Sequence, residues 1–520
     1  MTSTARFDLA VVGSGFAGSL LALLARRRGL SVLLLERGSH PRFAIGESTS
    51  PLTNLLLEEI AREYDLPELL PLTAYGPWKR TYPEIGVGLK RGFSFYAHAA
   101  GEPFCSDPKR SNQLLVAASP NSEVADTHWF RADFDAFLVE LAQRYGAEYQ
   151  DRSALENVSW TPSGAQLEVR QAGQDATYRA RFVVDASGPA GALQRFLPLE
   201  RGALEHAPVT RALYSHFTGV SLFAEIVGDG GETPPYPPDD AALHHVFPGG
   251  WMWVLRFDNG ITSAGFAVEE WLAEELGLPA SVGLEQSALE AIWERFLTRY
   301  PSIGEHLRGA ERVEPWYHAP RLAYRTGPAA GEGWALLPST AAFVDPLFST
   351  GFPLALLGVR RLAALLDPEA DPASRTDGLA AYAAVTQREA ATAARLVGGC
   401  YAAFPNFPAF ASLTMIYFAA ASFSEMARRL ERPYLAPEFL LGGRADFRGL
   451  LERHTDAARN GAPPTLAALA TDLEPFNVAG LCVPEKRNWY GVDPADVVAG
   501  AAKLGVSPEE VRELFRRMGL

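Results

Sequence analysis

Closely spaced glycines near the start of the chain are suited to binding a ligand that carries phosphate. Gly13, Gly15 and Gly18 form the pattern Gly-x-Gly-x-x-Gly. The first glycine makes a tight turn, the second lets the backbone approach a pyrophosphate, and the third allows a helix to pack closely on a strand. Glu36 can accept hydrogen bonds from a ribose, and it would repel a 2′-phosphate. The pattern therefore predicts a dinucleotide-binding turn.

The residues around this turn predict the elements that position it. Residues 7–12 are mostly apolar, as in a buried parallel strand, and an apolar helix follows the glycines as far as Leu24. Three arginines at 26–28 suit the negative end of that helix, and Gly29 suits its C-terminal cap. Residues 31–35 form a second strand that ends at Glu36. The N-terminus is thus a complete strand–turn–helix–strand unit, which is the context that makes the glycine pattern specific.

The rest of the chain alternates between sheet and helix patterns. Alternating aromatic and polar residues predict antiparallel strands with one buried face, and Ala- and Leu-rich stretches predict helices. We expect such strands in 84–98 and 244–268, a helix over 131–145, a buried strand over 178–185, an exposed loop over 228–240, and helices from Gly351 to a terminal helix at 508–518.

Composition excludes several classes of protein. The chain has 520 residues, of which 48% are hydrophobic and 21% charged, so it is not disordered, collagenous or a coiled coil. Its net charge of −14 disfavours nucleic acid and anionic membrane as main partners. Three widely spaced cysteines indicate neither a disulfide framework nor a metal site, and they suit a reducing cytoplasm. Residues 396–423 carry no charge, but Pro405 and Pro408 interrupt them, which favours a buried helix over a membrane span.

The glycine pattern does not distinguish FAD from NAD, but four other segments resemble flavin-dependent halogenases. They occur in the order that this family uses and extend from the N-terminus to about residue 360. They are Pro-Arg-Phe-Ala-Ile-Gly-Glu-Ser-Thr-Ser-Pro at 41–51, Lys-Arg-Gly-Phe-Ser-Phe at 90–95, Val-Val-Asp-Ala-Ser-Gly at 183–188, and Phe-Val-Asp-Pro-Leu-Phe-Ser-Thr-Gly at 343–351.

The resemblance implies an α/β protein with a Rossmann-type FAD-binding domain of the p-hydroxybenzoate-hydroxylase type. A sheet-based substrate domain would be interleaved with it, and a helical region would follow. We expect the FAD-binding parts at 1–80, 111–200 and 316–370, the substrate-domain parts at 81–110 and 201–315, and the helical C-terminal region at 371–520.

The resemblance also implies which residues contact FAD. They belong to the glycine turn, to the ends of strands and to the later FAD-contacting segments of the family. The expected cofactor-binding residues are Gly13, Ser14, Gly15, Phe16, Ala17, Gly18, Glu36, Arg37, Gly46, Glu47, Ser48, Arg131, Ser339, Asp345 and Phe352.

In the family, reduced FAD and oxygen oxidise a halide, and a lysine near the substrate directs the oxidant. Here Lys90 matches that lysine, and the backbone N–H groups of Thr350 and Gly351 match the halide site at the start of a helix. Lys90 can also be read as an ordinary solvated lysine, and Lys79 is a second candidate that no motif surrounds. No metal site is expected, because His98, His244 and His245 have no carboxylate or cysteine at ligand spacing.

Three departures from the family pattern bear on the substrate and on FAD binding. Phe348 stands where members that halogenate tryptophan carry a glutamate, so a phenol or pyrrole substrate is favoured. Ser339 replaces an aspartate that holds the ribityl chain. Arg256 replaces the proline of the family's Trp-x-Trp-x-Ile-Pro motif, whose tryptophans here are Trp251 and Trp253. These two rings either face the substrate or pack in the core.

Halogenation or hydroxylation of an aromatic or electron-rich substrate is therefore the main hypothesis. Two alternatives stay open: an alkene reductase of the same fold, and a flavin-binding protein that acts only through a partner. No second Gly-x-Gly-x-x-Gly occurs, so we expect a separate flavin reductase to supply reduced flavin. The aromatic residues clustered in 401–423 and 475–490 line a substrate pocket or form a helical cover.

Overall fold

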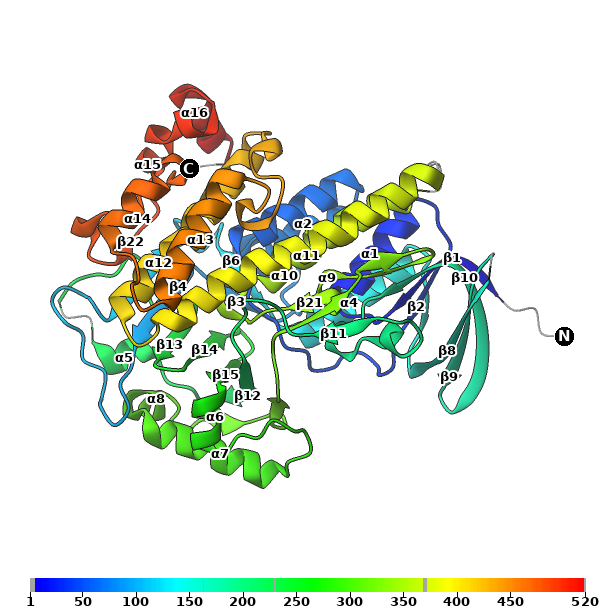
Figure 1. Cartoon of the computed structure of the whole chain (residues 1–520), viewed down its shortest axis with the longest axis horizontal. Helices are drawn as coiled ribbons and strands as arrows, with labels where there is room; N and C mark the ends of the chain where they lie inside the picture. Colours follow the sequence, from blue (N-terminus) through cyan, green and yellow to red (C-terminus); the bar gives the residue numbers. More distant parts are fainter. Residues whose placement is uncertain (1–4, 162, 229–230, 368–371, 519–520) are drawn as a thin grey trace.

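A mainly parallel sheet forms one end of the molecule (Figure 1). The computed structural model describes residues 5–161, 163–228, 231–367 and 372–518. Strand β1 (Arg6–Val12) lies in the middle of this sheet, between β2 (Val32–Leu35) and β10 (Gln174–Asp185). Outside them lie β7 (Glu148–Gln150) and β20 (Trp334–Leu336), and these five strands run parallel. The antiparallel strands β8 (Ser153–Thr161) and β9 (Gly164–Gln171) extend from β10.

The N-terminal unit predicted from the sequence is confirmed. Helix α1 (Phe16–Arg27) follows the glycine turn, with its C-cap at Arg28 and Gly29 in the left-handed region at φ 81°. Its middle residues are almost completely buried between β1 and two further helices, α4 (Arg131–Arg144) and α10 (Gly351–Leu365). Parallel strands covered by helices are buried on both faces, which explains the continuous apolar runs of β1 and β2.

A second, nine-stranded sheet forms the other half of the molecule. Its strands belong to widely separated segments of the chain. They are β4 (Gly92–Ala97), β5 (Gln113–Ala117), β12 (Thr210–Thr218), β13 (Ala242–Phe247), β14 (Gly250–Arg256), β15 (Thr262–Glu269), β16 (Glu311–Arg312), β17 (Tyr317–Ala319) and β22 (Trp489–Tyr490).

The expectation of antiparallel strands with one buried face was wrong in two respects. First, β4 pairs antiparallel with β5 but parallel with β13. Second, β13 and β4 are buried on both faces, because apolar clusters lie on each side of the sheet. The earlier strand of this segment, β3 (Val87–Lys90), leaves the sheet and pairs with β6 (Asp126–Trp129).

Helices complete the chain, as the sequence predicted. Helix α11 (Pro372–Ala403) crosses the molecule, and α12 (Phe407–Arg429) packs between the two halves (Figure 1). Helix α12 is apolar enough in length and composition to cross a membrane, but 83% of its most apolar window is buried inside the protein. Further helices follow: α13 (Ala445–Arg459), α14 (Leu466–Leu473), α15 (Pro494–Ala499) and α16 (Pro508–Met518). The chain is thus a mixed α/β protein with a helical C-terminal region, while the domain boundaries given above stay predictions.

Candidate active site

Two glycines of the turn between β1 and α1, Gly13 and Gly18, have no room for a side chain. Gly13 has φ 108°, and a Cβ added to it would lie 2.6 Å from the carbonyl oxygen of Ala186. A Cβ on Gly18 would lie 2.1 Å from the carbonyl oxygen of Gly13. Both contacts are with backbone, which cannot rotate away. Gly15 is different, since a Cβ there would meet only side-chain atoms, 3.6 Å away or more. Its backbone therefore remains open to a ligand at the start of α1.

Glu36 lies directly beside this turn. Its carboxylate accepts hydrogen bonds from the Ser14 backbone N–H and hydroxyl, at 3.2 and 2.9 Å, and from the Gly38 N–H at 2.8 Å. Burial opposes ionisation of this carboxyl, but the Gly38 N–H and the nearby Arg42 guanidinium outweigh it, so the pKa of Glu36 is lowered. A charged acceptor is thus fixed next to the turn, where a ribose would lie.

The guanidinium of Arg131 lies beside four of the expected cofactor-binding residues. Its guanidinium forms a two-point ion pair with Asp135 and donates to the Gly46 carbonyl oxygen at 2.9 Å. It also lies over the ring of Phe16, whose centroid is 4.8 Å from that of Phe352. Gly15 adjoins the same guanidinium. The segment after β2, the start of α1, and the first turns of α4 and α10 therefore meet at one point.

Other expected contacts are spread more widely. Glu47 is buried and pairs with His216 of β12 at 2.7 Å, so its carboxylate links the two halves of the molecule. Arg37 is exposed, and Ala17 is buried within α1. Ser339 is half-buried, and its carbonyl oxygen accepts a hydrogen bond from Tyr324. The structure does not bring these four side chains together.

Lys90 ends β3 and is completely buried. Its ammonium nitrogen donates to the Ser48 hydroxyl at 2.8 Å, the Thr49 carbonyl oxygen at 2.5 Å and the Ser349 hydroxyl at 3.2 Å. It also lies 3.8 Å from the centroid of the Phe93 ring. The reading of Lys90 as a solvated lysine is therefore wrong. Three segments that are far apart in the sequence meet at this one nitrogen.

Asp126 and Asn54 belong to the same buried cluster, and the sequence did not single them out. Lys90 and Asp126 are register partners across β3 and β6. Asn54 of helix α2 (Pro51–Glu63) donates to Asp126 at 2.9 Å. Burial lowers the pKa of Lys90 and raises that of Asp126, and each group partly offsets the shift of the other. No motif marks these two residues, because only the pairing of β3 with β6 places them here.

The expected halide site lies at the start of α10. Thr350 is the N-cap of this 15-residue helix, and a Cβ added to Gly351 would meet no atom within 4 Å. The residue before this turn, Phe348, adopts φ 65°, which a bulky side chain rarely does. The Tyr417 hydroxyl holds it by donating to its carbonyl oxygen at 2.8 Å, and the two rings stack at 4.7 Å.

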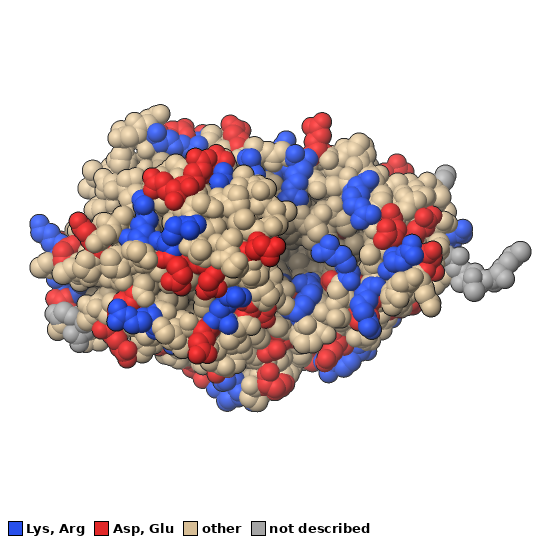
Figure 2. Space-filling view, turned by 90° about the horizontal axis from the view of Figure 1, so that it is seen from below, with Lys and Arg blue, Asp and Glu red and all other residues tan. Residues whose placement is uncertain are grey.

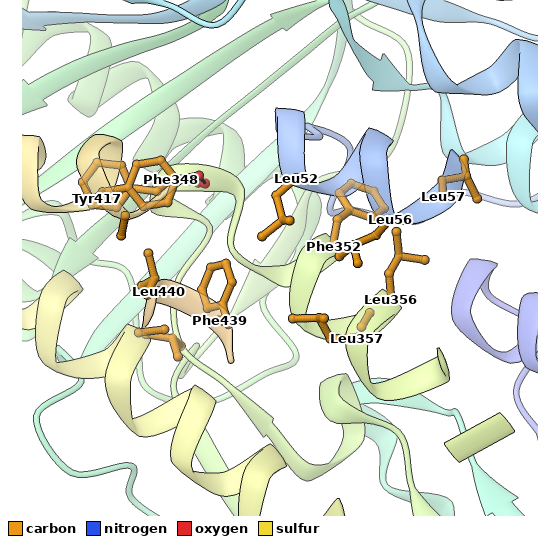
Figure 3. Close-up of a cluster of buried hydrophobic side chains, with 14 of the residues drawn as sticks. Leu52, Leu56, Leu57, Phe348, Phe352, Leu356, Leu357, Tyr417, Phe439 and Leu440 are labelled. Atoms are coloured by element: carbon orange, nitrogen blue, oxygen red, sulfur yellow. Dashed lines mark hydrogen bonds between the residues drawn. The ribbon is translucent and has the colours of Figure 1, made fainter. Parts of the chain in front are cut away.

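Apolar side chains pack around the residues on either side of Gly351, which is itself exposed. Figure 3 shows the stacked rings of Phe348 and Tyr417, and leucines of α2 packed against Phe352 and the next turns of α10. Phe439 and Leu440, from the C-terminal region, close the cluster on another side (Figure 3). The start of α10 therefore combines an exposed Gly351 with buried apolar residues on either side of it in the sequence.

Asp345 is the centre of a second buried network. It accepts hydrogen bonds from Trp251 at 3.1 Å, from the Tyr401 hydroxyl at 2.9 Å and from the Leu347 N–H at 2.9 Å. Burial raises the pKa of Asp345 to about 6, although these hydrogen bonds oppose the shift. The network fastens the turn before α10 to β14 and α11.

Other residues considered from the sequence have structural roles. Trp253 is buried and donates to Ser263, so its polar atom is satisfied within the core. Arg256 donates to the carbonyl oxygens of Val220 and Ser221 at 3.1 and 3.0 Å. Lys79 is paired with Asp258 near the surface, which leaves Lys90 as the buried candidate. Among the described residues, no group of three or more His, Cys, Asp or Glu side chains could hold a metal ion.

One face of the molecule is hollowed. Figure 2 shows the hollow near the middle of the face seen from below, with Lys and Arg side chains on one side of it and Asp or Glu side chains on the other. The chain as a whole carries a net charge of −14. Charges of both signs therefore lie around this hollow, so it does not by itself favour an anionic ligand.

Comparison with other proteins agrees with this geometry. Residues 11–53 match the family model described as an NAD(P)-binding Rossmann-like domain. The chain is 33% identical over 351 residues to the tetracycline 7-halogenase of Kitasatospora aureofaciens, and 30% identical over 360 residues to the monodechloroaminopyrrolnitrin halogenase PrnC of Pseudomonas fluorescens. These alignments cover 66% and 69% of this chain, but only 60% and 61% of the two relatives.

The fold comparison covers more of the chain. The crystal structure of the halogenase PltM in complex with phloroglucinol and FAD matches 92% of this chain and 99% of that chain, with a TM-score of 0.82 and 25% identity. The chain is therefore similar in sequence to flavin-dependent halogenases over about two thirds of its length, and similar in fold to a halogenase over 92% of it.

Proposed function

We propose that this protein binds FAD and halogenates an electron-rich aromatic substrate, such as a phenol or a pyrrole. When bound and reduced, FAD would supply the two electrons with which oxygen converts a halide into an electrophilic oxidant. A ring carbon of the substrate then gains the halogen and loses a proton. The relatives are named as halogenases, and PltM was crystallised with phloroglucinol and FAD. The chain spans about 60% of the two curated relatives, so the proposal rests on the site itself.

The residues around the glycine turn fit FAD. Gly15 and Gly46 both lie beside the Arg131 guanidinium, and a Cβ on either would meet only side-chain atoms no closer than 3.6 Å. A pyrophosphate at the start of α1 would receive backbone N–H groups and the positive end of the helix dipole. Glu36 would accept from the ribose. Ser339 offers a hydroxyl to the ribityl chain, a weaker partner than a carboxylate.

The burial of Lys90 is the observation that carries the proposal. A lysine is rarely buried completely, because its charge loses its hydration. Here three oxygen atoms fix the ammonium nitrogen beside Ser349, immediately before the halide turn at Thr350 and Gly351. A cation held at that point would hydrogen-bond a neutral oxidant and direct it towards a substrate once the oxidant takes the place of one of these three acceptors.

Two further partners follow from this proposal. The halide would bind at the backbone N–H groups of Thr350 and Gly351, where α10 begins. Reduced flavin would come from a separate reductase, since the sequence has one glycine pattern of the dinucleotide type. We place the reaction in the cytoplasm, where free cysteines such as Cys400 and Cys482 stay reduced.

The test is a halogenation assay with purified protein, FAD, a flavin reductase, oxygen and bromide. A panel of phenols, pyrroles and tryptophan is supplied, and products are identified by mass spectrometry. We expect monobrominated phenol or pyrrole. The Lys90→Ala variant should lose at least about 100-fold in bromination rate, the usual contribution of a positioned acid, while flavin oxidation continues.

Lys79→Ala is the matched control, because Lys79 is paired near the surface and should not affect bromination. Oxygenated products without bromine would show a monooxygenase instead. A saturated product formed from an alkene without oxygen would show a reductase. Peroxide as the sole product over the whole panel would support a flavin-binding protein without turnover of its own.

A further inference from the structure

Asp126 is a buried carboxylate on the strand that pairs with the strand of Lys90. The two residues are directly opposed in the antiparallel pair of β3 and β6. One carboxylate oxygen of Asp126 accepts from the Asn54 amide at 2.9 Å, and the other has no hydrogen-bond partner among the described residues. An acceptor left without a partner in the interior is costly, and a charged one more so. Its position therefore needs a compensating interaction.

Lys90 is a buried cation that has no negatively charged hydrogen-bond partner in the described part of the chain. Its three hydrogen-bond acceptors, at Ser48, Thr49 and Ser349, are all neutral oxygen atoms. They match the three N–H groups of an ammonium ion, but they supply no negative charge. Burial lowers the pKa of Lys90, and the charge of Asp126 is the effect that raises it.

The other ionisable groups around the pair do not replace Asp126. Glu425 and Arg429 of α12 face Asp126, but they bond to each other at 2.8 Å, so their charges largely cancel. Tyr417, on the same helix, has its pKa raised by burial and is neutral. Burial also lowers the pKa of His128 and of His244, and the charge of Lys90 adds to both shifts.

We propose that Asp126 is a positioning residue for halogenation: its carboxylate keeps Lys90 in the ammonium form, and Asn54 holds that carboxylate in place. This inference rests on the proposed function, because the ammonium of Lys90 directs the oxidant there. Asp126 is not proposed to contact the substrate or the halide. It acts through the charge of Lys90, so its loss changes the pH range of the reaction rather than the chemistry.

The charge of Lys90 can be measured without any turnover. The sequence contains five lysines, at 79, 90, 109, 486 and 503. Lysine labelled with ¹³C at Cε gives one NMR signal for each, and Lys90→Met identifies the signal of Lys90. In Asp126→Asn we expect the titration midpoint of Lys90 to fall by about one pH unit or more. Asp258→Asn is the matched control, since it removes the carboxylate of Lys79 and should leave Lys90 unchanged.

Bromination provides the second readout. The high-pH limb of the rate profile should move to lower pH in Asp126→Asn, while flavin oxidation keeps its wild-type profile. If the low-pH limb moves instead, neutral Lys90 is the active form and the proposal is overturned. An unchanged NMR titration of Lys90 overturns it as well.

A second variant covers the case in which Asp126→Asn does not fold. Asn54→Leu removes the donor to Asp126, which disfavours the ionised carboxylate, so the midpoint of Lys90 should fall in the same direction by a smaller amount. No shift in this variant contradicts the proposal. If the wild-type protein brominates nothing, the proposed function fails, but the NMR titration still decides whether Asp126 sets the charge of Lys90.

Discussion

The glycine turn and the Lys90 cluster are built in opposite ways. The glycine pattern occupies six consecutive residues, from the end of one strand into the first turn of one helix, and Gly13 and Gly18 are fixed by close contacts with backbone. The cluster combines Ser48, Lys90, Asp126 and Ser349, which four different segments supply. Binding the dinucleotide therefore depends on local geometry, whereas placing the reactive cation depends on how the whole chain folds.

The strongest test of this contrast is Gly18→Ala, which we expect to abolish FAD binding. The added Cβ would lie 2.1 Å from the Gly13 carbonyl oxygen and 2.9 Å from the Ala186 Cβ, so the turn must open. Overpacking of this kind costs about 1–3 kcal/mol of stability and displaces the N–H groups from the pyrophosphate. The bound flavin is measured by its absorbance relative to that of the protein.

Gly202→Ala is the control for this substitution. A Cβ at Gly202 would meet no atom within 4 Å, and the residue does not need a left-handed backbone. This variant should bind FAD as the wild type does. Full FAD binding by Gly18→Ala would show that the turn is less rigid than its contacts indicate.

An intermediate effect is expected at Ser349. Ser349→Ala removes one of three acceptors from the buried Lys90 ammonium, a bond to a charged group worth about 1.5–3 kcal/mol. The bromination rate should fall about tenfold or more at saturating bromide, while FAD affinity stays unchanged. Ser163→Ala, at an exposed position, serves as the control. Weakened FAD binding in Ser349→Ala would mean that the two regions are not independent.

A smaller effect is expected from Tyr417→Phe. The variant keeps the ring stack with Phe348 but loses the hydrogen bond to its carbonyl oxygen, about 1 kcal/mol of support for a left-handed backbone at φ 65°. The turn before α10 should then loosen. We expect a few-fold rise in peroxide released per brominated product, measured with a peroxide-coupled assay. Unchanged coupling would show that this turn is held by packing alone.

A third region should respond to pH without affecting either site. His98, His245 and His306 form a buried chain, with ring nitrogens 2.9 and 3.1 Å apart. Burial lowers the pKa of His98 and of His306 to about 3, and that of His245 also falls well below its ordinary value. The unfolded chain therefore takes up protons first as the pH falls.

Stability should change little above about pH 6.5, the ordinary value of histidine, and should decrease as the pH falls from there towards 3. The midpoint of urea unfolding, measured at intervals between pH 8 and 4, checks this expectation. A midpoint that rises on acidification in this range would contradict the burial of these neutral rings.

The fold could be predicted where the pattern is local. The glycine turn, its strands and α1 follow from short apolar runs and caps, and the structure matches them within a few residues. The parallel pairing of β4 with β13 could not be predicted, because these strands are about 150 residues apart in the chain and alternation alone does not set direction.

The residues of the candidate site also differ in whether the sequence alone could identify them. Lys90 could be found because a family motif surrounds it, and Arg131 because it opens a helix and resembles an arginine that contacts FAD in this fold. Asp126 and Asn54 lie in segments without any motif, and only the β3–β6 register and α2 bring them to the cluster. The left-handed backbone at Phe348 was equally hidden, since a bulky residue there contradicts ordinary preference.

Strand β22 has a consequence for how the protein is synthesised. Trp489 and Tyr490 pair with β5, at the edge of the second sheet, from a point almost four hundred residues further along the chain. During translation, the backbone N–H and C=O groups on this edge of β5 stay unpaired until Trp489 and Tyr490 have left the ribosome. Exposed edges of this kind recruit strands from other molecules. Chains interrupted before residue 489 should therefore aggregate, even though both candidate sites are already encoded.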